Sequence, residues 1–115
     1  MFKLKRVYEE PSPDDGTRVL VERLWPRGLT KERAAVDLWL KELAPSTELR
    51  KWYSHDVDRW EEFQQRYGQE LKEKTDALHE LKQKGKSDTI TLVYAAHDED
   101  HNSAVVLKRH LQGRR

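Results

Sequence analysis

Two stretches of the chain carry runs of apolar residues, and both predict strands that are buried on two faces. The first is Arg18–Leu24, which reads RVLVERL and leads into Trp25-Pro26-Arg27-Gly28. Pro26 lacks a backbone donor and Gly28 permits a turn, so this strand is expected to end there. The second is Asp88–Ala96, whose β-branched and almost uncharged residues are typical of a central strand in a parallel sheet.

The chain between these strands has the spacing of amphipathic helices. Thr30 is a suitable N-cap for a short helix through about Ala35, and Ser46 is a suitable N-cap for a helix that begins at Thr47. Asp56 can cap a longer helix, in which large apolar residues recur on one face at Trp60, Phe63, Tyr67 and Leu71. Such an aromatic stripe is more typical of a core than of a ligand site.

The remaining segments are less regular. Residues 2–8 alternate apolar and basic side chains and predict a short first strand, whereas residues 36–43 fit neither a helical nor a strand period. Helix-forming composition continues from Leu71 to Lys84, and Gly85 is expected to end this helix as its C-cap. Asp98 is expected to cap a last helix, whose apolar face contains Ala104, Leu107 and Leu111.

The order of these elements is strand, strand, several helices, strand, helix, and it predicts an α/β fold. Because buried strands separated by helices favour parallel pairing, we expect a small, mainly parallel sheet of about three strands covered by helices. The 115 residues fit a single domain, residues 1–115. Only 36% of the residues are hydrophobic and 37% are charged, so the core is expected to depend on large aromatic side chains, including four Trp.

Charge and cysteine content exclude several classes of function. The 22 Lys and Arg residues nearly balance the 21 Asp and Glu residues, and a net charge of +1 argues against a protein that binds nucleic acid over its whole surface. Because the chain contains no cysteine, disulfides, thiolate metal sites and a cysteine nucleophile are excluded.

The chain also lacks the features of a membrane protein. No segment reaches the roughly 18 apolar residues of a membrane span, and the first residues lack a signal-peptide core, so we expect a cytoplasmic protein without a membrane partner. The basic end at Arg114 and Arg115 is expected to be a solvated terminus. A sheet this small leaves pairing into a homodimer open.

The candidate site lies where the first buried strand is expected to end. Arg23, Trp25 and Arg27 leave that strand together, and the carboxyl ends of strands are the edge at which open α/β sheets collect ligands. A second basic and aromatic group accompanies the predicted helix cap and consists of Ser46, Arg50 and Trp52. Arginine suits phosphate or carboxylate groups, and a helix N-terminus adds backbone donors. The alternative is that the arginines pair with carboxylates while the tryptophans fill the core.

Histidine and carboxylate side chains gather beyond the last strand. Asp98 could fix the tautomer of His101 for proton transfer, with Asn102 beside it. His55 could also face this site, or join the histidines in binding a metal. The alternative is that these residues only cap a helix and contact solvent. The spacing does not favour a metal site and the chain has no glycine-rich nucleotide loop, so neither a metal nor another cofactor is expected.

Three segments carry distinctive motifs. Residues 18–28 contain Leu-Trp-Pro-Arg-Gly, residues 43–52 contain Ala-Pro-Ser-Thr-Glu-Leu-Arg, and residues 94–107 begin with Tyr-Ala-Ala-His-Asp. Together they resemble the short, YeaO-like members of the family known as domain of unknown function 488, over nearly the whole chain. This resemblance implies no established reaction. Longer relatives look as though they place a Cys and a His after the last strand, where this chain has His101-Asn102, so the resemblance implies no thiol chemistry here.

These observations predict a pocket for a small anionic ligand, such as a nucleotide, a phosphate ester or a carboxylate, at the carboxyl ends of the strands. The arginines at positions 23, 27 and 50 would hold the anion, and the tryptophans at positions 25 and 52 would line the pocket. His101 and Asn102 would orient the ligand or move protons, and the sequence leaves open whether the pocket only binds or also catalyses. The alternative is a non-catalytic module that binds protein or nucleic acid through the basic and aromatic surface.

Overall fold

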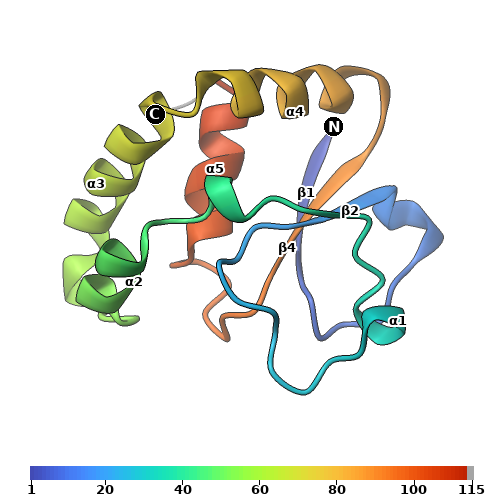
Figure 1. Ribbon diagram of the computed structural model, residues 1–115, viewed down its shortest axis with the longest axis horizontal. Helices are drawn as coiled ribbons and strands as arrows, with labels where there is room; N and C mark the ends of the chain where they lie inside the picture. Colours follow the sequence, from blue (N-terminus) through green and yellow to red (C-terminus); the bar gives the residue numbers. More distant parts are fainter. Residues whose placement is uncertain (114–115) are drawn as a thin grey trace.

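The computed structural model describes residues 1–113 and contains a four-stranded parallel sheet. The strands are β1 (Phe2–Arg6), β2 (Thr17–Leu20), β3 (Leu38–Trp39) and β4 (Ile90–Tyr94), and they lie in the order β1-β4-β2-β3 (Figure 1). The predicted α/β class and parallel sheet are confirmed. The added strand is β3, a two-residue strand from the segment without a clear period. The basic terminus predicted at Arg114 and Arg115 lies outside the described residues.

Strand β4 lies between β1 and β2 and is buried along its whole length. Its Leu92 is paired with Leu4 of β1 on one side and with Val19 of β2 on the other. Burial of all five residues agrees with the uninterrupted apolar run from which this strand is predicted. Because the strands are parallel, their carboxyl ends meet at one edge of the sheet.

Strand β2 is shorter than its apolar run predicts. Val21 donates a hydrogen bond to the Val93 carbonyl at 3.4 Å, but the chain then leaves the sheet. The Glu22 carbonyl accepts a hydrogen bond from the Trp39 indole at 2.6 Å instead of one from a neighbouring strand. The predicted continuation to Leu24 is therefore wrong, because a side chain occupies the backbone group that a longer strand would have used.

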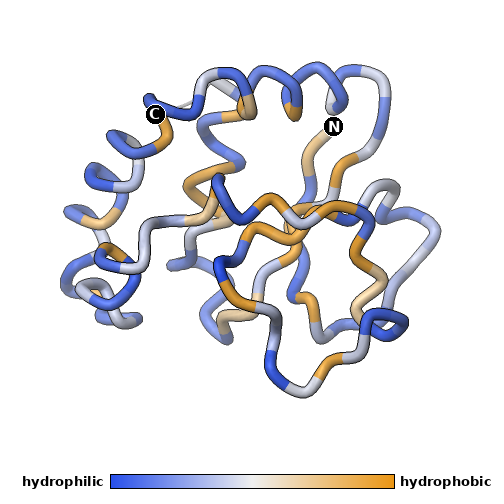
Figure 2. Tube along the Cα trace, in the orientation of Figure 1, coloured by the Kyte–Doolittle hydropathy of each residue, from blue (hydrophilic) through white to orange (hydrophobic). Residues whose placement is uncertain are grey.

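Four helices pack on one face of the sheet: α2 (Thr47–Tyr53), α3 (Trp60–Lys72), α4 (Thr75–Ser87) and α5 (Ser103–Leu111). Helix α5 contacts β1 and β4, and α3 packs on α5 (Figure 1). The predicted apolar stripe of α3 is core, with Phe63, Tyr67 and Leu71 at most 2% exposed. Figure 2 shows apolar positions gathered along the central strands and hydrophilic ones along much of the outer helices. No helix within residues 1–113 has the length and apolar character needed to cross a membrane.

The other face of the sheet is covered by α1 (Lys31–Ala34) and the chain on either side of it. Its buried cluster consists of Val7, Leu20, Ala34 and Val93. Trp25 and Trp39 pack against this cluster, and their rings meet edge to face with centroids 5.4 Å apart. The two faces of the sheet thus have separate cores, and Trp25 belongs to the one opposite the four helices.

The predicted helix from Leu71 to Lys84 is divided between two helices. Helix α3 ends at Lys72, and α4 begins at Thr75. Gly85 is not the C-cap of this segment but a buried residue within α4. A side chain at this position would overlap the ring of Phe2. The prediction is wrong because this glycine permits a close helix-to-strand contact rather than a turn.

Helix α5 begins later than predicted. Its N-cap is Asn102, whose side-chain oxygen accepts from the Val105 amide at 3.1 Å. Asp98 instead accepts from the amides of Asp100 and His101, at 2.9 and 3.0 Å. The prediction of Asp98 as the helix cap is wrong because an additional turn lies between β4 and α5 and uses this carboxylate. Of the other predicted caps, Thr30 of α1 and Ser46 of α2 are confirmed, whereas Asp56 caps the short 3-10 helix Val57–Arg59, which leads directly into α3.

Candidate functional site

A cavity of about 270 Å³ lies at the carboxyl ends of β2 and β4. It is enclosed by the segment after β2, the start and end of α2, one residue of α3, and the turn that leads into α5. The residues that line it are Glu22, Arg23, Ala44, Pro45, Arg50, Lys51, Tyr53, Ser54, His55, Phe63, Tyr94, Ala96, Asn102 and Ser103. Four of the predicted site residues are among them: Arg23, Arg50, His55 and Asn102.

Two arginines reach the cavity from different segments, and they differ in whether their guanidinium groups are already hydrogen-bonded. The Arg23 guanidinium donates from Nε to the Pro45 carbonyl at 3.0 Å and from Nη2 to the Ala44 carbonyl at 3.3 Å. It thereby fixes the wall that precedes α2. Arg50 projects from α2 and is exposed. Among residues 1–113 it forms no side-chain hydrogen bond and no ion pair, so its planar set of donors remains available at the cavity.

Glu22 adds a carboxylate to this basic lining. Burial raises the pKa of Glu22 above its ordinary value, although the Ala95 amide and the charge of Arg50 act in the opposite direction. The carboxyl therefore lies near the end of β4 and within range of the Arg50 charge. The cavity therefore contains one carboxylate among three cationic side chains, those of Arg23, Arg50 and Lys51.

Aromatic side chains form the apolar part of the lining. Tyr53 and Phe63 stack with ring centroids 4.3 Å apart, and both are buried. The Tyr53 hydroxyl donates to the His101 carbonyl at 3.0 Å, which ties α2 to the turn before α5. Burial, helped by the charges of Asp98 and Asp56, raises the pKa of Tyr53, so this hydroxyl keeps its proton at neutral pH.

His55 lines the cavity because the chain turns back after α2. Ser54 and His55 both have left-handed backbone, with φ of 47° and 59°, which is uncommon for residues with side chains. The Ser54 amide donates to the Arg50 carbonyl at 3.0 Å, and the Asp56 amide donates to the Tyr53 carbonyl at 2.9 Å. These two bonds hold the turn that brings His55 to the cavity.

The structure brings Asp98 and His101 together beside the cavity. His101 Nδ1 lies 2.9 Å from Asp98 Oδ2. This is a hydrogen-bond distance, and a carboxylate at this position can fix the tautomer of the imidazole. Hydrogen bonds from the Asp100 amide and from His101 lower the pKa of Asp98 below its ordinary value. The His101 ring meets Trp60 edge on, with centroids 5.2 Å apart, and neither Asp98 nor His101 lines the cavity.

Asn102 lines the cavity, but its side chain is occupied. Its oxygen caps α5, and its nitrogen donates to the Asp98 carbonyl at 2.9 Å. The residue is 4% exposed, so it shapes the turn before α5 and has no free polar atom for proton transfer. Ser103, the first residue of α5, presents the amino end of that helix to the cavity.

Two of the predicted site residues lie elsewhere because the chain folds toward the other face of the sheet after Glu22. Trp25 donates from its indole to the Leu29 carbonyl at 2.7 Å within the second core. Arg27 is exposed, and its carbonyl accepts from the Tyr8 hydroxyl at 2.9 Å. The structure therefore separates the three residues that leave the first strand, and only Arg23 reaches the cavity.

The other two, Ser46 before α2 and Trp52 within it, do not line the cavity. Ser46 donates to the Glu70 carboxylate from its amide at 2.8 Å and from its hydroxyl at 2.6 Å. The Trp52 ring is covered by the guanidinium groups of Arg59 and Arg66, which lie 5.1 and 4.3 Å from its centroid.

The sequence analysis did not predict Glu22, Tyr53 and Tyr94 as lining residues. Only Tyr94, the last residue of a buried strand, has a clear signal for that position.

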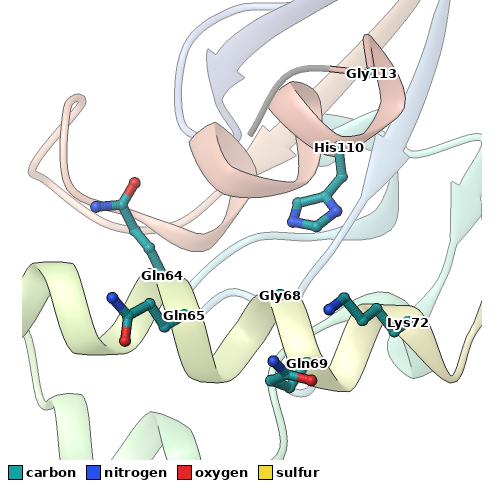
Figure 3. A pocket seen from close by; sticks show the side chains of 7 residues that line it. All are labelled: Gln64, Gln65, Gly68, Gln69, Lys72, His110 and Gly113. Atoms are coloured by element: carbon teal, nitrogen blue, oxygen red, sulfur yellow. The ribbon is translucent and has the colours of Figure 1, made fainter.

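A second hollow, of about 690 Å³, is a groove between α3 and α5 (Figure 3). Its lining consists of Gln64, Gln65, Gly68, Gln69, Lys72, His110 and Gly113. Figure 3 shows His110 of α5 pointing toward Gly68, where a Cβ atom would lie 3.3 Å from Nε2. Burial and the charge of Lys72 lower the pKa of His110, which favours a neutral imidazole. The groove contains none of the predicted site residues.

The described part of the chain contains no group of three His, Asp or Glu side chains arranged to hold a metal ion. The histidines at positions 55 and 101, which the sequence left open as ligands, therefore have no third partner of this kind within residues 1–113.

Residues 1–114 match the family model described as the inactive DUF488-N3 subclade. The chain is 44% identical over 112 residues to the uncharacterized protein Rv3073c of Mycobacterium tuberculosis, which covers 97% of this chain and 94% of the relative. It is 42% identical over 106 residues to the uncharacterized protein YeaO of Escherichia coli, which covers 92% of each chain. No solved structure matches the chain significantly.

Proposed function

The chain belongs to the DUF488 family, as its motifs predict, and we propose that it binds a small ligand with an anionic group in the cavity at the ends of β2 and β4. The ligand classes that this chemistry accommodates are carboxylates, phosphate esters and nucleotides. The proposal concerns binding, and it assigns no reaction to the site.

The observation that carries the proposal is the Arg50 side chain. It lines the cavity and has no hydrogen-bond or ion-pair partner among the described residues. A guanidinium group offers a planar set of donors that matches a carboxylate or a phosphate. Lys51 adds a second cation, Arg23 a third, and the amino end of α5 adds partial positive charge.

Binding without catalysis is supported by the state of the candidate catalytic residues. The Asn102 side chain is occupied at both polar atoms, and His101 does not line the cavity. The chain has no cysteine, and its subclade is described as inactive. We therefore propose that Asp98 and His101 form a structural pair that holds the turn before α5.

The alternative, an interaction module that uses exposed tryptophan and basic residues, has less support. Trp52 is already covered by two guanidinium groups, and these are balanced by carboxylates. Arg59 pairs with Asp56 at 3.6 Å, and Arg66 pairs with Glu62. A surface whose charges are paired in this way offers little attraction to a nucleic-acid backbone.

The proposal is tested by thermal denaturation in the presence of phosphates, nucleotides and carboxylate metabolites, at low and moderate salt. A ligand at one hundred times its Kd stabilises the folded protein by about 2.7 kcal/mol, which is several degrees for a chain of this size. We expect at least one compound to raise the Tm of the wild type and of Arg27→Ala, but not of Arg50→Ala. Arg27 is the matched control, because it is an exposed arginine outside the cavity. A panel without any stabilising compound, or a shift that survives in Arg50→Ala, contradicts the proposal.

A further inference from the structure

Glu22 and Arg50 are opposite charges that line one cavity without forming an ion pair. Both belong to its lining, and the charge of Arg50 acts on the Glu22 carboxyl. Among residues 1–113, neither side chain takes part in an ion pair. The cavity therefore offers a carboxylate and a guanidinium that do not neutralise each other by direct contact.

The ionised Glu22 carboxylate lowers the stability of the folded, unliganded protein. A charged group that is largely removed from water destabilises the fold unless it is paired and hydrogen-bonded. Here the Ala95 amide and the more distant Arg50 charge compensate only in part, and the net effect of the surroundings favours the neutral acid. A half-buried carboxylate whose pKa is raised, and which forms no ion pair among residues 1–113, marks a position where a ligand can supply a cationic partner.

The remaining lining limits the size and polarity of what can enter. Tyr53 and Phe63 form an apolar wall, and Tyr94 and Ala96 continue it at the end of β4. The volume of about 270 Å³ accommodates a compact molecule. A ligand that fits this lining has two polar ends and an apolar body.

We propose that the ligand is a compact zwitterion of the amino-acid type, whose ammonium group binds Glu22 and whose carboxylate binds Arg50. This inference rests on the proposed function, since the anionic group is the one assigned there to Arg50. It adds that Glu22 determines specificity. A plain anion would place a second negative charge near Glu22, and a plain amine would face Arg50, Lys51 and Arg23 with no anion to offset them.

The test compares matched ligands that differ only in their charged groups. After a screen of the common L-amino acids by isothermal titration calorimetry, each binder is compared with its analogues that lack the amine or the carboxylate. For leucine these are 4-methylpentanoate and 3-methylbutylamine. We expect the wild type to bind the amino acid at least tenfold more tightly than either analogue.

The variants Glu22→Gln and Glu80→Gln then assign the effect. Glu22→Gln should bind the amino acid at least tenfold more weakly than the wild type does. Its affinity for the carboxylate analogue should be unchanged. Glu80 is exposed on α4 and serves as the control, so Glu80→Gln should bind as the wild type does.

Two results would overturn the inference, and they are distinguishable. If the carboxylate analogue binds as tightly as the amino acid, and Glu22→Gln has no effect, the proposal of a zwitterionic ligand is wrong. The proposal that Arg50 binds an anionic group is then retained. If no amino acid and no analogue binds, while the phosphates and nucleotides of the thermal panel also fail, both proposals are wrong. The comparison of ligands on the wild type decides the question even if Glu22→Gln does not fold.

Discussion

Arg23 and Pro45 are joined by a hydrogen bond of 3.0 Å from the Arg23 Nε to the Pro45 carbonyl. A second bond, from Nη2, reaches the carbonyl of the residue before Pro45 at 3.3 Å. These bonds connect the chain that leaves β2 to the start of α2, from which Arg50 projects. The position of Arg50 over the ends of the strands therefore depends on Arg23.

We expect Arg23→Ala to destabilise the protein by about 2 kcal/mol, because it leaves two half-buried carbonyls without their charged donor. Urea denaturation at neutral pH measures this loss. Arg27→Ala, which removes an exposed arginine, should change the free energy of unfolding by less than about 0.5 kcal/mol. Equal stabilities for the two variants would mean that Arg23 does not fix this wall.

Replacing Glu22 by Gln should stabilise the unliganded protein at neutral pH. Burial raises the pKa of Glu22 above the ordinary value of 4.5, so the folded state binds this proton more tightly than the unfolded state. Stability from this group is present below pH 4.5 and is lost as the pH rises through the raised pKa. The groups that oppose the shift are the Ala95 amide and Arg50, while Tyr67 lies close enough to interact with the carboxylate. Thermal denaturation between pH 4 and 8 should show the Tm advantage of Glu22→Gln growing with pH; an advantage independent of pH would contradict this account.

Asp15 should have the opposite effect on pH dependence. Burial alone would raise its pKa, but the Ser12 amide, Lys5 and Arg18 outweigh burial and lower the pKa below 3.8. Arg18 is 3% exposed and lies 2.8 Å from the Asp15 carboxylate. The stability that Asp15 provides is therefore present above pH 3.8 and is lost as the pH falls through the lowered value.

The corresponding variant is Asp15→Asn, which leaves the buried Arg18 without its counter-charge. We expect a loss of about 3–5 kcal/mol at neutral pH, measured by urea denaturation. The loss should shrink as the pH falls through the lowered pKa of Asp15, because the wild-type carboxylate is then neutralised as well. A variant as stable as the wild type at pH 7 would show that the ion pair is not required.

Gly85→Ala should destabilise the protein although it lies in a helix. Alanine at a helix interior is normally favoured over glycine by about 1 kcal/mol, but here a side chain would overlap the Phe2 ring. Such overpacking costs about 1–3 kcal/mol. Guanidinium denaturation of Gly85→Ala in the wild-type and Phe2→Leu backgrounds separates the two effects, because the smaller side chain relieves the overlap. If Gly85→Ala is equally unfavourable in both backgrounds, the Phe2 contact is not its cause.

The sequence indicated the end of the sheet at which the cavity lies, and strong local signals explain this. The uninterrupted apolar run determines β4 as a central strand, and the Pro-Ser-Thr sequence sets Ser46 as the N-cap of α2. These two elements bring Arg50 and His55 to the cavity. The residues that were misplaced depend on contacts with no local signal.

Trp25 is the clearest example of such a residue. A tryptophan just after a strand can pack on either face of the sheet, and its choice here follows from the edge-to-face contact with Trp39. Trp39 in turn lies in a segment without a clear period. Asn102 and Asp98 illustrate a second limit: both are good caps, and only the additional turn after β4 decides which of them begins α5.

The most direct test of a binding cavity at the strand ends is to map binding onto the backbone amides. ¹⁵N-labelled protein is titrated with inorganic phosphate and, separately, with leucine while ¹H-¹⁵N correlation spectra are recorded. We predict that at least one probe shifts the amides of Ser54, His55, Ala96 and Ser103, and that these shifts disappear in Arg50→Ala. Shifts confined to the groove between α3 and α5, at Gly68 and His110, or spectra unchanged at the cavity with both probes, would contradict the account.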